Sequence, residues 1–410
     1  RERDMDGRVY RMYMGAVRIE ADTMGELEVP ADMYYGCQTA RSLINFDIGD
    51  DLMPRGVIRA FGILKQAAAK VNSDLGQLDG KVAKLIISAA EEVINGELDD
   101  HFPLRVWQTG SGTQSNMNTN EVIANRAIEM AGGVLGSKSP VHPNDHVNRA
   151  QSSNDTFPTA MHISSAEAIT KDLIPSLREL RDSFAAKSEE WSGIVKIGRT
   201  HLMDAVPISF EQELNVWEEQ VRASQSQIDL SCEEISYLPI GGTAIGTGIN
   251  SPKKFSRNVC QELNKIYSEM KIKFKPLEIK GEMMSSQNHI LTLSSALTRY
   301  ASTLLKIAND IRWMNSGPIS GLSEITLKAL QPGSSIMPGK INPVLSESIM
   351  MAATQVNGNH TTIVQASSSG NFQLNTMLPL IAHNIIESLY LMINSTFSMI
   401  DLIDSFTVNE

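Results

Sequence analysis

Apolar residues recur every three or four positions through the part of the chain that follows residue 150. In 155–190 the positions with this spacing are Met161, Ile163, Ala166, Ile169, Leu173, Ile174, Leu177 and Leu180, with charged residues between them. The spacing matches the 3.6-residue period of an α-helix, so it predicts a long amphipathic helix. The same interpretation predicts further long helices over 207–236, 281–315, 343–366 and 378–403.

The first 150 residues have a different pattern, in which Gly, Pro, Asn and Asp clusters interrupt shorter helical stretches near 55–75, 80–95 and 117–131. We therefore expect an N-terminal domain over 1–151 and a helical bundle domain over 152–404. The five long stretches are rich in Ala, Leu, Ile, Met and Ser and are apolar on more than one face. Such helices pack closely, and their surplus apolar surface predicts association with other subunits.

Composition narrows the class of protein further. The chain has 410 residues and a formal net charge of −11, which argues against binding to nucleic acid or to an anionic membrane surface. Its three cysteines are odd in number and far apart, as in proteins of a reducing compartment. No apolar stretch has the length of a membrane span, and acids near the start are atypical of a transit peptide. We expect a cytoplasmic enzyme.

The segment 333–343, with sequence GSSIMPGKINP, carries the densest candidate chemistry. Two glycines and two prolines predict a constrained loop whose backbone N–H groups are exposed. Together with Lys340 and Asn342, these donors can stabilise a carboxylate whose negative charge grows during a reaction. The alternative interpretation is an ordinary glycine and proline surface loop.

A second polar cluster, 110–118, is a glycine-rich turn that leads into a helix. Its amides and hydroxyls can bind a carboxylate at a helix N-terminus. The alternative is a simple capping turn, with Ser115 or Asn116 as the cap.

A third cluster, from His142 to Asp155, has more hydroxyl and amide donors than capping one helix requires. His142, Asp145 and His146 are candidate metal ligands by residue type. Pro143 argues against a helical ligand face, so we expect no metal site here.

The fourth cluster, 198–207, contains His201, which can act as an acid or a base near neutral pH if a partner holds its proton. Glu347, close in sequence to the 333–343 loop, is the candidate partner. A hydrogen-bonded structural histidine is the alternative.

In this order and with these separations, the four clusters resemble the fumarase and aspartase superfamily, and in detail its class II fumarate hydratases. The resemblance covers most of the chain, from 18–25 (RIEADTMG) through 107–114 (WQTGSGTQ) to 370–375 (GNFQLN). Gly339 before Lys340, and Ser153 as the second residue of the Ser-Ser pair, resemble fumarases. Aspartases typically have alanine and threonine at these two places.

The resemblance implies a mainly α fold with a mixed N-terminal domain and a central five-helix bundle. It also implies a homotetramer whose bundles join in a twenty-helix core, with each active site drawn from three subunits. Family members usually continue into a small C-terminal helical domain. Residues 405–410 would be its start, and we expect that domain to be absent or truncated here.

The resemblance also implies roles for particular residues. Ser334 would remove the C3 proton of malate, and His201, polarised by Glu347, would act at the hydroxyl side. Lys340 would stabilise the charge that develops on the carboxylate. The residues implied in substrate binding are Ser111, Thr113, Ser152, Ser153, Asn154, Thr200, Ser335 and Asn342. Those implied in a secondary anion site are His142, Asn144 and Asp145.

The implied reaction is the reversible hydration of fumarate to L-malate through an aci-carboxylate intermediate, with no metal, nicotinamide or pyridoxal cofactor. An aspartate ammonia-lyase would use the same loop and base. A catalytically silent helical scaffold is a further alternative. The presence of Ser334, His201, Lys340 and Glu347 argues against it, because a scaffold has no need of them.

Overall fold

The computed structural model describes residues 15–410 and divides into two compact units, each assembled from separate stretches of chain. The first unit comprises the chain up to Ala166, Ile235–Ile290 and Ile363–Ile386. The second comprises Glu167–Glu234, Leu291–Thr362 and Glu387–Glu410. The division into domains in chain order, with a boundary at 151, stays a prediction.

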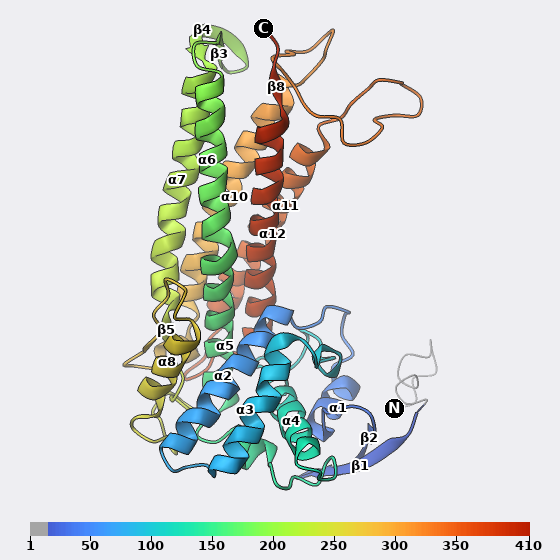
Figure 1. Cartoon of the computed structure of the whole chain (residues 1–410), viewed down its shortest axis with the longest axis vertical. Coiled ribbons are helices and arrows are strands. Elements are labelled where there is room, and N and C mark those ends of the chain that lie inside the picture. Colours follow the sequence, from blue (N-terminus) through green and yellow to red (C-terminus); the bar gives the residue numbers. More distant parts are fainter. Residues whose placement is uncertain (1–14) are drawn as a thin grey trace. The chain divides into compact units, whose positions relative to one another are not determined.

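The first unit is a mixed domain of short strands and medium-length helices (Figure 1). Its N-terminal elements are β1 (Val17–Asp22), β2 (Gly25–Pro30), α1 (Cys37–Asn45), α2 (Arg55–Asp74), α3 (Gly80–Asn95) and α4 (Thr113–Met130). The π turn η2 (Pro143–Val147) precedes α5 (Ser153–Ala168). Its later elements are β5 (Tyr237–Leu238), α8 (Phe255–Ile266), β6 (Lys275–Pro276) and α9 (Glu282–Ser285).

Local sequence accounts for the ends of these helices and apolar periodicity for their packing. Asp79 caps α3 by accepting hydrogen bonds from the backbone N–H groups of Lys81 and Val82, and Gly96 ends the helix in the left-handed conformation. The α3 residues Ile86 and Val93 are fully buried in a core shared with α4. The helices predicted near 55–75, 80–95 and 117–131 are confirmed.

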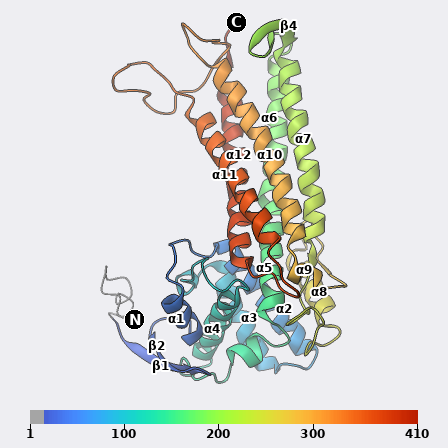
Figure 2. The same ribbon diagram turned by 180° about the vertical axis from the view of Figure 1, so that it is seen from behind.

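The second unit is built on long helices that run side by side in both Figure 1 and Figure 2. They are α6 (Ile174–Glu190) and the greater part of α7 (Phe210–Ile235), α10 (Asn288–Met314), α11 (Val344–Ser367) and α12 (Leu378–Ser405). Phe184 of α6 meets Trp217 of α7 edge to face, and the Tyr300 hydroxyl of α10 is 2.7 Å from that of Thr396 on α12. The predicted long helices are confirmed, with the π turn η3 (Ile169–Leu173) between α5 and α6.

One element of the second unit was not predicted, the hairpin formed by β3 (Val195–Thr200) and β4 (Met203–Ser209). Its two-residue turn places His201 and Leu202 at φ values of 58° and 60°. Such turns usually contain Asn or Gly, so this sequence carried no turn signal. Two short strands, β7 (Ile325–Thr326) and β8 (Thr407–Val408), pair elsewhere in this unit.

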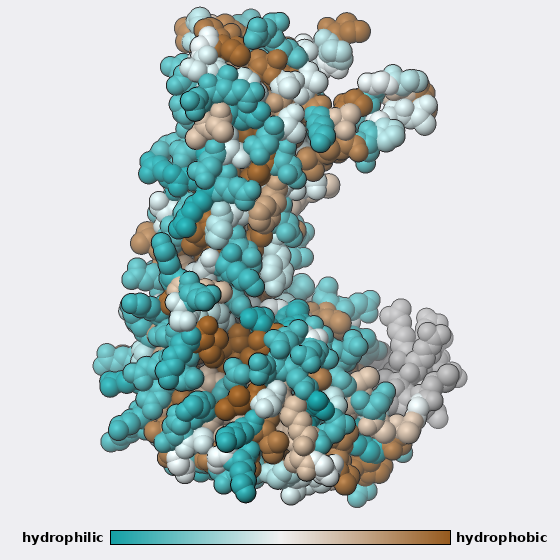
Figure 3. Space-filling model, in the orientation of Figure 1, coloured by the Kyte–Doolittle hydropathy of each residue, from teal (hydrophilic) through white to brown (hydrophobic). Residues whose placement is uncertain are grey.

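The face shown in Figure 3 is largely hydrophilic, with apolar side chains between the hydrophilic ones. Leu202, Met203 and Val206 of the hairpin are each more than 60% exposed. Among residues 15–410, no helix combines the length and apolar character needed to cross a bilayer.

Candidate active site

Most predicted site residues of the first unit lie at the N-termini of α4 and α5, and the others lie at η2. The turn before α4 is restricted to glycine by close contacts. A Cβ on Gly112 would lie 2.1 Å from the ring of Phe157, and one on Gly110 would lie 1.5 Å from the Thr376 carbonyl oxygen. Gly112 also has a φ of 70°, which side chains disfavour.

A chain of hydroxyl groups joins the two helix starts. The Thr113 Oγ1 atom lies 2.8 Å from Ser111 Oγ and 2.8 Å from Ser153 Oγ. The structure therefore brings the second and third polar clusters together at two helix N-termini, where free N–H groups favour an anion.

The capping interpretation of the first of these turns is wrong. Gly112 is the N-cap of α4, and Ser115 and Asn116 lie inside the helix. The Ser115 hydroxyl donates to Gln108 Oε1, and Asn116 Oδ1 accepts a hydrogen bond from Lys65 Nζ.

The buried carboxylate of Asp155 joins the start of the Ser152-Ser153-Asn154 segment to residues 241–243. Its carboxylate accepts hydrogen bonds of 2.9 Å from the backbone N–H groups of Ser152, Gly241 and Thr243. Burial raises the pKa of Asp155 to about 6, while these three donors oppose the shift. The Asn154 side chain in turn donates to the Ala244 carbonyl oxygen at 2.8 Å.

His142, Asn144 and Asp145 lie at the π turn η2. The His142 Nδ1 atom accepts from the backbone N–H groups of Asn144 and Asp145, each at 3.1 Å, which leaves Nε2 to carry the proton. His146 Nδ1 accepts from the His142 backbone N–H at 2.8 Å. Pro143 occupies the first position of this turn, where a missing N–H is tolerated. Asn144, Asp145 and Ser152 line a common cavity of about 470 Å³.

In the second unit, the 333–343 segment forms a loop that closes on itself. A Cβ on Gly333 would lie 1.4 Å from the Lys340 carbonyl oxygen, so only glycine permits the closure. Gly339 has a φ of 83°, where alanine would be strained. Inside the loop, the Ser334 Oγ atom accepts from the backbone N–H groups of Ile336 at 3.2 Å and Met337 at 3.3 Å.

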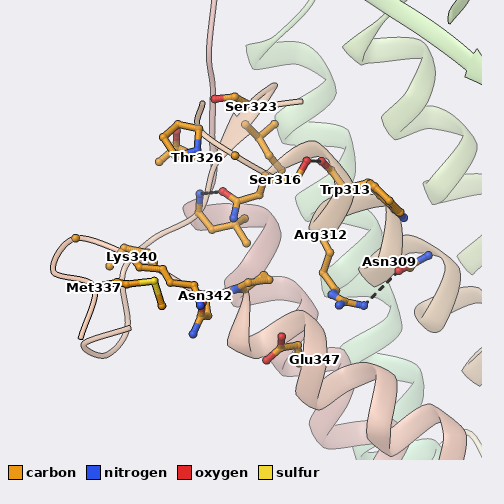
Figure 4. Close-up of a pocket in the computed structure, with 18 residues that line it drawn as sticks. Asn309, Arg312, Trp313, Ser316, Ser323, Thr326, Met337, Lys340, Asn342 and Glu347 are labelled. Carbon is orange, nitrogen blue, oxygen red and sulfur yellow. Dashed lines mark hydrogen bonds between the residues drawn. The ribbon is translucent and has the colours of Figure 1, made fainter. Parts of the chain in front are cut away.

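Lys340, Asn342 and Glu347 line one cavity of about 780 Å³ (Figure 4). Lys340 and Asn342 come from the loop, and Glu347 comes from the first turn of α11. Arg312 of α10 also lines this cavity and donates to Asn309 Oδ1 at 3.4 Å. Its buried Nε atom has no hydrogen-bond partner among the described residues. Sequence reasoning missed Arg312, because nothing distinguishes one arginine near a helix end before the fold is known.

Thr200 and His201 lie at the exposed tip of the β3–β4 hairpin. Glu324 binds strand β3 at two places along its length, because it accepts from Arg199 at 2.6 Å and pairs with Lys196 at 2.9 Å. Within residues 15–410 of one chain, no hydrogen bond or ion pair joins His201 to Glu347.

Among the described residues, Glu20, Cys37 and Glu121 bring three potential metal-ligand atoms within 4.8 Å of one another. All three side chains are buried, and protein groups already bind the two carboxylates. Arg18 pairs with Glu20 at 2.7 Å, and Thr39 and Gln38 donate to Glu121. This group lines a small cavity together with His142 and Asn144 of the predicted secondary anion site.

Comparison with known proteins shows which class of protein combines these long helices with polar clusters at loops and helix termini. The family described as Lyase matches residues 25–358. Class II fumarate hydratase of Caulobacter vibrioides is 50% identical over 388 residues, which are 95% of this chain and 83% of that protein. Mitochondrial fumarate hydratase of Danio rerio is 52% identical over 385 residues, or 93% of this chain and 75% of that one.

The fold agrees as well. A crystal structure of class II fumarase from Schistosoma mansoni superposes with a TM-score of 0.94 at 40% identity, covering 96% of this chain and 85% of that chain. The chain belongs to the lyase family and, within it, to the class II fumarate hydratases.

Proposed function

We propose that this protein is a fumarate hydratase that interconverts fumarate and L-malate. The observation that carries the proposal is the environment of Ser334. Two backbone N–H groups point at its Oγ atom, inside a loop that also presents Lys340 and Asn342. A serine hydroxyl is a weak base at its ordinary pKa, and these donors favour its alkoxide.

In the direction of dehydration, the Ser334 alkoxide takes the C3 proton of malate. The electron pair left on C3 delocalises into the neighbouring carboxylate, which becomes a dianionic aci-carboxylate. Lys340 and Asn342 bind that group and stabilise the added charge. The C2 hydroxyl then leaves as water on the opposite face, with a proton delivered from the side of His201, and fumarate remains. Hydration is the reverse, an anti addition.

We assign Glu347 to His201 as its carboxylate partner, supplied by another subunit. A carboxylate beside the imidazole favours its protonated form and so prepares it to deliver a proton. The hydroxyl-lined helix termini around Thr113 and Ser153 would hold the substrate carboxylates, with Thr200, Ser335 and Asn154 completing the contacts. His142, Asn144 and Asp145 would form the secondary anion site.

We further propose a homotetramer with each active site shared by three subunits, located in the cytoplasm. Exposed apolar residues such as Met351 of α11 and Phe397 of α12, 68% and 45% exposed, support burial of these helices against other subunits. The cysteines are unpaired and buried, as expected in a reducing compartment.

The test is an ultraviolet assay of fumarate consumption by purified protein, with and without ammonia and with a chelator present. We expect malate to form without ammonia and without added metal. Consumption of fumarate that requires ammonia, with no malate formed, would instead assign an aspartate ammonia-lyase.

A further inference from the structure

Lys65 of α2 is a fully buried lysine that the reaction scheme leaves unused. Its side chain is 0% exposed, and its Nζ atom lies within hydrogen-bond distance of three side-chain amide oxygens. These are Asn116 Oδ1 at 2.7 Å, Asn148 Oδ1 at 2.9 Å and Gln151 Oε1 at 2.9 Å.

The three acceptors match the three donors of an ammonium group. A neutral amine has only two N–H bonds, so its lone pair would face one of the amide oxygens. Among the described residues no carboxylate contacts Lys65, and the charged group that acts on it is Asp155 at the start of α5. Burial of an ammonium group is costly unless all of its donors are used, and here all are used.

The three amides belong to the segments that carry the proposed substrate contacts. Asn116 lies in the first turn of α4, three residues after Thr113. It also accepts a 3.0 Å hydrogen bond from Thr156 of α5. Gln151 immediately precedes Ser152 in the chain. One ammonium group therefore ties α2 to the N-termini of both anion-binding helices.

We propose that Lys65 is a positioning residue for the substrate carboxylate, and that its ammonium form holds the α4 and α5 N-termini in their binding arrangement. The inference rests on the proposed function, because it concerns the affinity of that site for a dicarboxylate. Lys65 itself is buried beneath the site and is not a catalytic residue.

A pH effect on substrate affinity follows. Burial lowers the pKa of Lys65 to about 7, while the charge of Asp155 opposes the shift. Loss of the proton removes one of the three donors and turns the lone pair of the amine toward one of the amide oxygens, which repel it. The arrangement of the helix termini is then weakened, so affinity for a dicarboxylate falls as pH rises through the pKa of Lys65.

The experiment compares Lys65→Met and Asn148→Asp with Lys70→Met as the matched control. Lys70 lies on the same helix but is exposed and pairs with Asp74 at 2.5 Å. For each protein, KM for fumarate, kcat and the dissociation constant of succinate are measured from pH 6 to 9, with circular dichroism to check folding.

For Lys65→Met we expect KM and the succinate constant to rise about tenfold, with a smaller change in kcat, because Ser334 and Lys340 lie in a different loop. Asn148→Asp keeps the acceptor atom and places a carboxylate opposite the ammonium group. That charge raises the pKa of Lys65 and moves the alkaline loss of affinity to higher pH by about one unit or more. Lys70→Met should match the wild type in every measurement.

If Lys65→Met does not fold, the pH profile of substrate affinity in Asn148→Asp tests the proposal by itself. An Asn148→Asp profile that coincides with the wild-type curve would overturn the proposal, as would a folded Lys65→Met variant with unchanged KM. A wild-type protein that does not hydrate fumarate would contradict the proposed function instead, so the two failures are distinguishable.

Discussion

At the scale of single residues, the backbone around Ser334 explains how a hydroxyl group can take part in proton abstraction. Gly333 allows the loop to close, and the closure turns the N–H groups of Ile336 and Met337 toward Oγ. Ser335 is exposed and has no comparable pair of donors among the described residues. The two neighbouring serines are thus chemically different although the sequence presents them as equals.

This difference leads to a prediction about kcat. Ser334→Ala should lower kcat by roughly a hundred- to ten-thousandfold, the usual effect of losing a positioned general base. Succinate should still bind, because Lys340 and Asn342 remain. Ser335→Ala should lower kcat less, because the base is retained. Steady-state kinetics on both variants is the measurement. If Ser335 were the base, Ser335→Ala would show the larger loss of kcat.

Sequence reasoning identified the exposed polar residues of the candidate site but missed the buried groups that hold them. The serines and threonines stand out because they cluster in loops beside glycine. Lys65 does not stand out, because it lies within a helical stretch and acquires its partners only through tertiary folding. Asp155 belongs to the third polar cluster, but its buried contacts with Gly241 and Thr243 also arise only in the folded chain. The pairing of His201 with Glu347 stays a prediction.

At the scale of elements, apolar periodicity predicted the long helices but did not predict the β3–β4 hairpin. The long stretches predicted α7 and α11 to within a few residues, because their pattern extends over several turns. The β3–β4 hairpin has short strands whose side chains are largely exposed, so the alternation of apolar and polar residues is weak. The start of α1 illustrates a further limit, because the group that binds its N-terminal N–H groups comes from another helix.

That group is Glu121 of α4, whose carboxylate accepts from the backbone N–H groups of Gln38 at 3.1 Å and Thr39 at 3.0 Å. The side chain is buried, and burial raises its pKa to about 8. Folded protein therefore holds a proton on Glu121 between pH 4.5 and 8, where the unfolded chain has released it. This contribution to stability is complete below pH 4.5 and is lost as pH rises through about 8.

Glu121→Gln should remove this pH dependence of the free energy of unfolding, which amounts to as much as about 1.4 kcal/mol per pH unit. We expect the difference in Tm, variant minus wild type, to become more favourable to the variant as pH rises from 5 to 8. Glu129→Gln, on the same helix, is the control, because Tyr34 and Arg126 lower the pKa of Glu129 and its titration lies below this range. A Tm difference for Glu121→Gln that stays constant over this range would show that Glu121 is ionised throughout.

At the scale of the whole molecule, the candidate site residues are divided between the two units. Ser111, Thr113 and the 152–154 segment belong to the first unit, whereas His201, Ser334 and Lys340 belong to the second. The exposed apolar side chains of the bundle helices and of the hairpin support the proposed association of subunits. If subunits complete each other's sites, residues from the two units that serve one substrate come from different chains.

Mixing two inactive variants tests this arrangement. One variant carries Ser334→Ala, and the other carries Ser152→Ala together with Ser153→Ala. If the two regions of a site come from different subunits, random assembly gives about a quarter of the sites a full set of wild-type residues. Co-expression, or joint refolding of equal amounts, should then restore about a quarter of the wild-type activity, while each variant assembled alone stays inactive. Mixing the preformed oligomers without refolding is the control and should restore nothing. Activity that stays at the level of the single variants after joint refolding, with mixed oligomers verified by mass spectrometry, would place both regions of each site in the same chain.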